Sequence, residues 1–173
     1  MDLFEKFYNS ALRFLSYRPR SEKEIRDKLA ATTSNAADAE TQKVIDRVIQ
    51  KLKEYKFVDD VEFAKKWLES RSRFKPQSLR FTKIELKRKG IDSELVDRII
   101  HNSEFTIQND LEQSKKLIEK KMTRFRNPLR SEASKFGMTK QEIYQKLGRF
   151  LAGKGFDWDT IKKSIDKTLG KGV

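Results

Sequence analysis

The chain has 173 residues, with 39 Lys and Arg against 26 Asp and Glu, which gives a formal net charge of +13. It contains no cysteine, which excludes disulfides and thiolate metal sites, and no apolar run long enough to span a bilayer. Because the N-terminus also lacks the basic and then apolar order of a secretory signal, the sequence predicts a soluble cytoplasmic protein.

The first 56 residues predict three helices. A stripe that begins at Phe4 and Tyr8 lies on one helical face, and Pro19 ends that helix. The run Ser21-Glu22-Lys23-Glu24 is a capping box that opens a short helix. A small polar loop over residues 32–38 then precedes the strongest amphipathic stripe of the chain, formed by Val44, Ile45, Val48, Ile49, Leu52 and Tyr55.

Two further sets of three helices follow. In the second set, Asp59 or Asp60 caps a helix, Pro76 sits in the first turn of the next, and Asp92 caps the last. In the third set, a long helix over residues 111–125 precedes a loop over 126–138. The near capping box Thr139-Lys140-Gln141-Glu142 opens the next helix, and Asp157 caps the last. Trp67 and Trp158 are expected in the core rather than as stacking platforms.

One phrase occurs twice. Leu86-Lys87-Arg88-Lys89-Gly90-Ile91-Asp92 and Leu151-Ala152-Gly153-Lys154-Gly155-Phe156-Asp157 each read as a helix end, a Lys-Gly stop, an apolar residue and an Asp cap. Matching positions such as Gly90 and Gly155 lie 65 residues apart. The sequence therefore predicts an all-α fold of three tandem three-helix repeats in a thin, elongated array, with boundaries at 1–56, 57–104 and 105–173.

No pattern in the chain indicates catalysis or a cofactor. Residues 148–155 nearly fit a phosphate-binding loop, but Gly155 stands where Ser or Thr must reach Mg²⁺, and no strand precedes the segment. His101 is the only histidine and has no second His or Cys to join it at a metal. We therefore expect no enzyme activity, no metal and no cofactor.

Two basic clusters are the candidate binding residues. The first has one acid, Glu85, and surrounds Phe74 and Phe81; its predicted binding residues are Arg71, Arg73, Lys75, Arg80, Lys83, Lys87, Arg88 and Lys89. Arg80, Lys83 and Lys87 recur at helical spacing, which is typical of a stripe that tracks phosphates. The second cluster centres on Lys120, Lys121, Arg124 and Arg126. For both clusters, a merely solvated helix face is the alternative.

Several stretches resemble the RecX regulatory proteins. They are residues 11–15 with 18–25, then Leu52 to Asp60 with Phe63-Ala64, and Glu85 to Ile91. The likeness covers roughly residues 9–101, and the last third resembles the family only in helical layout and in its Lys-Gly phrase. Thr82 and the pair Lys75-Pro76 depart from the residues that the family usually has.

The resemblance implies three tandem three-helix repeats in a curved, elongated molecule. It also implies binding in the groove of the RecA–DNA filament, with inhibition of strand exchange and of ATP hydrolysis, and no catalysis by the protein itself. Single-stranded DNA would be reached through that filament. The alternative is a free-standing basic helical DNA-binding protein. No membrane partner is expected. A monomer is expected, because the sequence has no unused heptad seam that would argue for an oligomer.

Overall fold

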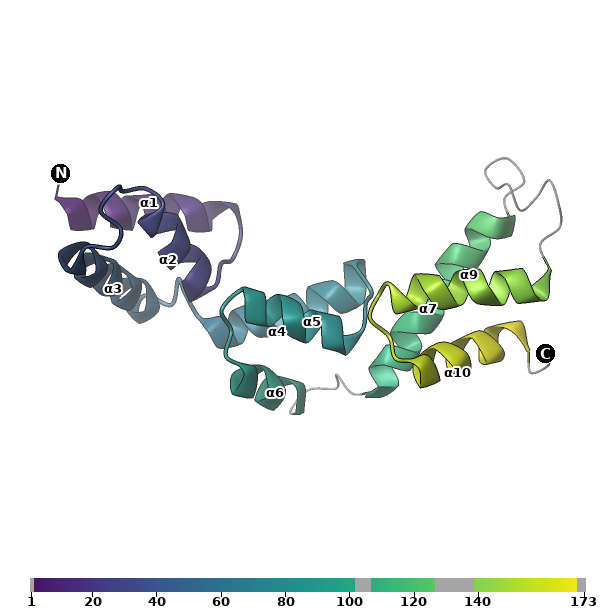
Figure 1. The fold of residues 1–173 in the computed structure, drawn as a ribbon. Helices are drawn as coiled ribbons and strands as arrows, with labels where there is room; N and C mark the ends of the chain where they lie inside the picture. The colour runs from purple at the N-terminus through teal and green to yellow at the C-terminus, as the bar shows by residue number, and fades with distance from the viewer. Residues whose placement is uncertain (1, 102–106, 127–138, 171–173) are drawn as a thin grey trace. The chain divides into compact units, whose positions relative to one another are not determined.

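The described part of the chain is entirely helical. The computed structural model describes residues 2–101, 107–126 and 139–170, and these contain nine helices and no strand (Figure 1). Of the predicted loop over residues 126–138, only Arg126 belongs to the described part of the chain, where it is the last residue of α7. The helices are α1 (Leu3–Tyr17), α2 (Glu22–Ala30), α3 (Ala39–Glu54), α4 (Asp60–Phe74), α5 (Leu79–Arg88), α6 (Ser93–His101), α7 (Ile107–Arg126), α9 (Lys140–Ala152) and α10 (Trp158–Leu169).

Contacts between residues divide the chain into two compact units. Unit 1 contains Met1–Trp67 and Glu85–Ile99, and unit 2 contains Leu68–Ile84 and Ile100–Val173. Helices α4 and α5 therefore contribute residues to both units. This division follows contact density rather than sequence repetition, and the repeat boundaries near residues 57 and 105 stay a prediction.

Unit 1 has its core where α1, α2 and α3 meet. Phe7 of α1, Ile25 and Leu29 of α2, and Ile45 and Leu52 of α3 are almost completely buried. The predicted capping box at Ser21 is confirmed, because its hydroxyl accepts the Glu24 backbone N–H while the Glu24 carboxylate accepts the Ser21 N–H. The amphipathic stripes read from the sequence are therefore the faces that pack together.

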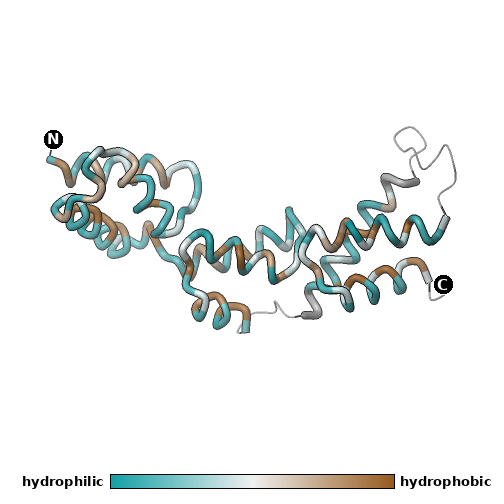
Figure 2. Tube along the Cα trace, in the orientation of Figure 1, coloured by the Kyte–Doolittle hydropathy of each residue, from teal (hydrophilic) through white to brown (hydrophobic). Residues whose placement is uncertain are grey.

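Unit 2 has its core between α7, α9 and α10. Ile118 of α7, Leu147 and Leu151 of α9, and Ile161 and Ile165 of α10 are buried. The hydroxyls of Ser114 and Ser164 are 2.5 Å apart inside this core, so two small polar residues satisfy each other where α7 and α10 approach. Figure 2 shows hydrophobic and hydrophilic residues alternating along these helices, as expected for elements with one buried face.

The repeated phrase forms the same helix end in both places. Gly90 and Gly155 have φ of +81° and +84°, and the next residue in each case donates its N–H to the carbonyl of Leu86 or Leu151. This is the glycine-terminated ending that the sequence predicts. Asp92 and Asp157 then accept backbone N–H groups at the start of α6 and α10, so both predicted caps are confirmed.

Two predictions about individual residues are wrong. Pro76 does not lie in the first turn of α5, because the helix begins at Leu79 and the Ser78 hydroxyl accepts the Phe81 N–H at its start. Trp158 is not a core residue, since 63% of it is exposed at the first position of α10. Phe156, two residues earlier, is the aromatic residue that is buried there.

Candidate functional site

Helix α5 presents a row of cations to solvent. Arg80, Lys83 and Lys87 are exposed and lie at the spacing of one helical face, while Thr82 and Leu86 on the other side are buried. Arg88 is also exposed. The Thr82 hydroxyl donates to the Ser78 carbonyl, which explains how a polar residue is accommodated inside. The structure thus brings together the part of the first basic cluster that recurs at helical spacing.

The remaining members of the first cluster lie in different surroundings. Arg73 and Lys75 are exposed at the end of α4 and just after it. Arg71 is half-buried and lines a small cavity in unit 2, together with Ser72, Gln77, Asp110 and Gln113. That cavity measures about 20 Å³, which is room for one water molecule and not for an organic ligand.

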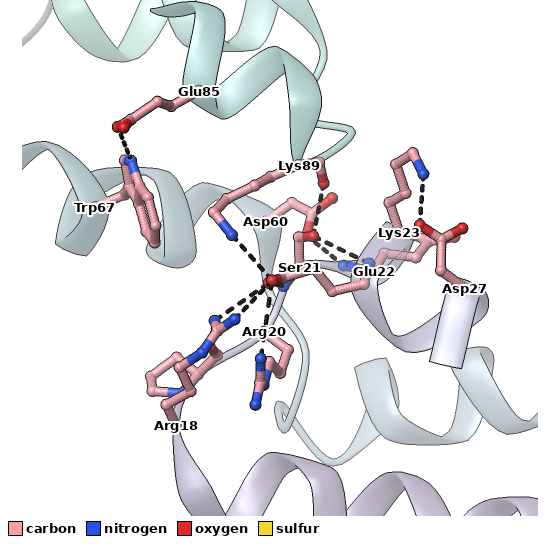
Figure 3. Close-up of polar contacts among 12 residues, drawn as sticks. Arg18, Arg20, Ser21, Glu22, Lys23, Asp27, Asp60, Trp67, Glu85 and Lys89 are labelled. Carbon is pink, nitrogen blue, oxygen red and sulfur yellow. Dashed lines mark hydrogen bonds and ion pairs between the residues drawn. The ribbon is translucent and has the colours of Figure 1, made fainter. Parts of the chain in front are cut away.

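Lys89 faces the inside of unit 1 rather than solvent. Its Nζ lies 2.9 Å from the Glu24 carboxylate and 4.4 Å from the centre of the Trp67 ring. Trp67 in turn donates its indole N–H to Glu85, and Figure 3 shows the Lys89 side chain directed between Trp67 and the residues around Ser21. A cation with these partners holds the fold together, so we leave Lys89 out of the proposed binding surface.

The same region joins α2 to α4 and α5. The Ser21 hydroxyl donates to the Lys89 carbonyl at 2.6 Å, and the Glu22 N–H donates to the Asp60 carboxylate at 2.9 Å (Figure 3). Gly90 packs against the Lys23 side chain. We call this arrangement joint 1. Asp59 caps α4 by accepting the Val61 and Glu62 N–H groups, which leaves Asp60 for the joint.

A second joint in unit 2 resembles the first, with the backbone N–H of a Ser as the donor in place of the Ser hydroxyl. The Ser78 N–H donates to the Lys154 carbonyl at 3.1 Å, and the Leu79 N–H donates to the Asp110 carboxylate at 2.8 Å. Gly155 packs against the Phe81 ring. In both joints a Ser at the start of a helix meets a Lys-Gly helix end, and the next N–H meets an Asp. Joint 2 therefore anchors the start of α5, which carries the basic row.

The second basic cluster is only partly described. Lys120 is exposed on α7, and the Lys121 Nζ lies 5.1 Å from the centre of the Phe150 ring. Arg124 and Arg126 belong to the last turns of α7, and their side chains lie outside the described part of the chain. The structure thus gives Lys121 a packing contact and places Lys120 in solvent.

Neither a metal site nor a membrane segment is found among the described residues. No group of three or more His, Asp or Glu side chains is arranged to hold a metal ion in the described ranges. No helix there is long and apolar enough to cross a membrane. The near phosphate-binding loop is the end of α9 and the turn that follows it, where the Lys154 carbonyl accepts from Ser78.

Joint 1 makes stability depend on pH through Glu24. Burial raises the pKa of Glu24, but hydrogen bonds from Arg18, Lys89 and the Ser21 backbone outweigh it and lower the pKa from 4.5 to about 2. The unfolded chain therefore takes up this proton at higher pH than the folded chain. The resulting stabilisation is complete above pH 4.5 and is lost as the pH falls toward 2.

We therefore expect Glu24→Gln to lower the free energy of unfolding by about 2 kcal/mol at pH 7 and by much less near pH 3. Urea unfolding at pH 7, 5 and 3 measures this difference. Burial raises the pKa of Asp60 in the same joint, so the effect of Asp60 on the pH dependence of stability is opposite to that of Glu24. The parent and the Glu24→Gln variant share this effect, so it does not contribute to their difference. Glu69→Gln, at an exposed position of α4, is the control; equal losses at all three pH values would contradict the expectation.

Comparison with known families decides what kind of protein carries these joints. Models of the first, second and third three-helix domains of RecX match residues 8–32, 59–99 and 108–165. A regulatory protein RecX from Clostridium tetani is 33% identical over 97% of this chain and 69% of its own length. The chain belongs to the RecX family.

Two further RecX proteins extend the comparison. The regulatory protein RecX of Bacillus velezensis is 30% identical, and this chain spans only 57% of that protein's length. The crystal structure of RecX from Lactobacillus salivarius superposes with a TM-score of 0.70 over 96% of each chain at 24% identity, which shows a shared fold. An all-α fold of tandem three-helix RecX domains is thereby confirmed, including the last third of the chain.

Proposed function

We propose that this protein binds the RecA–DNA filament and inhibits its recombinase and ATPase activities, using the exposed basic row of α5. The observation that carries the proposal is the row itself: Arg80, Lys83 and Lys87 share one solvent-facing side of a helix in a RecX domain. Arg73 and Lys75, exposed just before α5, extend the same positive region along the chain.

The chemistry of the filament suits such a row. A nucleoprotein filament offers DNA phosphates, and Lys and Arg side chains that neutralise phosphates release bound counterions. The net charge of +13 adds long-range attraction and speeds encounter with a polyanion. The row stands on a helix that joint 2 anchors at its start, so little backbone conformational entropy is lost when the row binds.

The proposal is tested by RecA-dependent ATP hydrolysis on single-stranded DNA at graded concentrations of this protein and of salt. We expect inhibition at low ionic strength and a steep loss of affinity as salt rises, with a log-log slope of about −0.7 per phosphate neutralised on a single strand. Inhibition of equal strength at low and physiological salt would argue against the basic row. If the protein fails to inhibit RecA-dependent ATP hydrolysis at every salt concentration tested, the proposed inhibition of RecA is rejected.

Binding to duplex DNA without RecA distinguishes the alternative function. A free-standing DNA-binding protein would hold bare duplex as tightly as it holds the filament, because its contacts would all be to DNA. A filament regulator is expected to bind the RecA-coated strand much more tightly than bare duplex. Fluorescence anisotropy with labelled duplex and with labelled RecA-coated strand, at one salt concentration, measures the ratio.

A further inference from the structure

Unit 2 carries two exposed aromatic side chains at helix ends. Phe74 is 72% exposed at the end of α4, and Trp158 is 63% exposed at the start of α10. An aromatic ring left this far in water adds little to folding, since the hydrophobic gain scales with the area removed from solvent. Neither ring is therefore explained by the core of unit 2.

Joint 2 connects the segment that follows Phe74 to the segment that precedes Trp158. The Ser78 N–H contacts the Lys154 carbonyl at 3.1 Å, with Phe74 four residues before Ser78 and Trp158 four residues after Lys154. Four residues span at most about 14 Å, so the Cα atom of each aromatic residue lies within about that distance of the joint. A single strand of about fifteen nucleotides, at no less than roughly 3.4 Å each, is long enough to reach both.

The positive charge around Phe74 indicates a negatively charged partner. Arg73 and Lys75 flank it and are exposed, Arg80 follows on α5, and residues 70–84 contain no Asp or Glu. Two exposed rings, one of them flanked by exposed cations, suit single-stranded nucleic acid, because its bases stack on aromatic rings and its phosphates pair with cations. A duplex keeps its bases stacked inside and does not offer them to such rings. An acidic protein surface would pair with the cations, but this pairing would not explain the two exposed rings.

We infer that Phe74 and Trp158 are base-stacking residues, and that the turns joined at Ser78 and Lys154 bind single-stranded nucleic acid directly. The inference deepens the proposed function and rests on it for its biological setting, because the single strand would be the one in the RecA filament. It adds a contact with the bases to the contacts that the α5 row makes with charge. Trp158 is flanked by Asp157 and Asp159, so its contribution is stacking rather than charge.

The experiment measures binding of the whole protein to labelled fifteen-residue oligothymidine without RecA, by fluorescence anisotropy. A second strand of equal length and charge, with abasic sites in place of bases, is the matched ligand. The test variant is Phe74→Leu with Trp158→Leu, which removes both rings and keeps all charges. The control variant is Tyr55→Leu with Phe57→Leu, a pair of rings in unit 1 that are 60% and 52% exposed.

We expect the Phe74 and Trp158 variant to bind oligothymidine at least about tenfold more weakly, while its binding to the abasic strand stays unchanged. Phe74→Tyr with Trp158→Phe, which restores aromatic rings, should recover most of the affinity. The control pair should bind like the parent. Circular dichroism at matched concentration checks that each variant is folded.

Equal binding of oligothymidine by the parent and the folded Leu variant would overturn the inference. So would a Leu variant that binds oligothymidine normally and yet inhibits RecA poorly, because the rings would then contact a protein. The proposed function fails separately, if the parent protein does not inhibit RecA-dependent ATP hydrolysis. The two failures are distinguishable because the first assay contains no RecA.

Discussion

Gly155→Ala is expected to lower the free energy of unfolding by about 2–4 kcal/mol. Gly155 has a φ of +84°, a conformation that costs an alanine roughly 1–2 kcal/mol. The added methyl group would also overlap the Phe81 ring, which packs on this glycine in joint 2. Both effects act in the folded state, so the loss should appear as a lower denaturation midpoint in urea.

Gly90→Ala should behave in the same way for joint 1. Its φ is +81°, and the new methyl would overlap the Lys23 side chain close to its backbone. Gly148→Ala is the matched control, because nothing lies within 4 Å of the added methyl and the residue is inside α9. That change should stabilise the protein by up to about 1 kcal/mol, since alanine favours a helix over glycine. Equal effects at all three glycines would refute the role of the joints.

The local signals in the sequence predicted most of the helices. The capping box at Ser21, the caps at Asp92 and Asp157, and the Lys-Gly endings each act within a few residues of themselves. Such short-range hydrogen bonds form between residues that are close in the sequence, so they can be predicted without knowing how the rest of the chain folds. The three-repeat interpretation followed from the repeated phrase, and the matches to three RecX domains support it.

The joints could not be predicted in the same way. Ser21 bonds to Lys89, and Leu79 bonds to Asp110, across separations of 68 and 31 residues. The signal was present, because a Ser stands at the start of α2 and of α5 and each repeated phrase supplies a Lys-Gly. A single sequence does not reveal which of these groups meet, since a polar residue at a helix start is equally consistent with an ordinary cap.

Burial of individual side chains was the other weak point. Lys89 belonged to the predicted cation cluster, and only the fold shows that Glu24 and Trp67 surround its ammonium group. Trp158 was expected inside because large aromatic residues usually are, yet its position at the first residue of α10 leaves it in solvent. Hydrophobic periodicity is least informative at a helix end, where one residue's shift changes the face that it occupies.

Charge reversal on the α5 row should abolish most of the regulatory effect. We expect Lys83→Glu with Lys87→Glu to raise the concentration needed for half-inhibition of RecA-dependent ATP hydrolysis by at least about tenfold, because two attractive contacts become repulsive. Both residues are exposed on α5, where a substitution usually changes the free energy of unfolding by about 0.5 kcal/mol or less. The melting temperature is measured in parallel to confirm this.

The control must change the net charge by the same amount at another place. Lys6→Glu with Lys65→Glu does so at exposed positions of α1 and α4, outside both basic clusters. If long-range attraction alone mattered, the two double variants would weaken inhibition equally, because net charge sets that term. A local contact surface instead predicts a large effect only on α5. A folded Lys83 and Lys87 variant that inhibits like the parent would move the site to α7, where Lys120 is exposed on the second basic cluster.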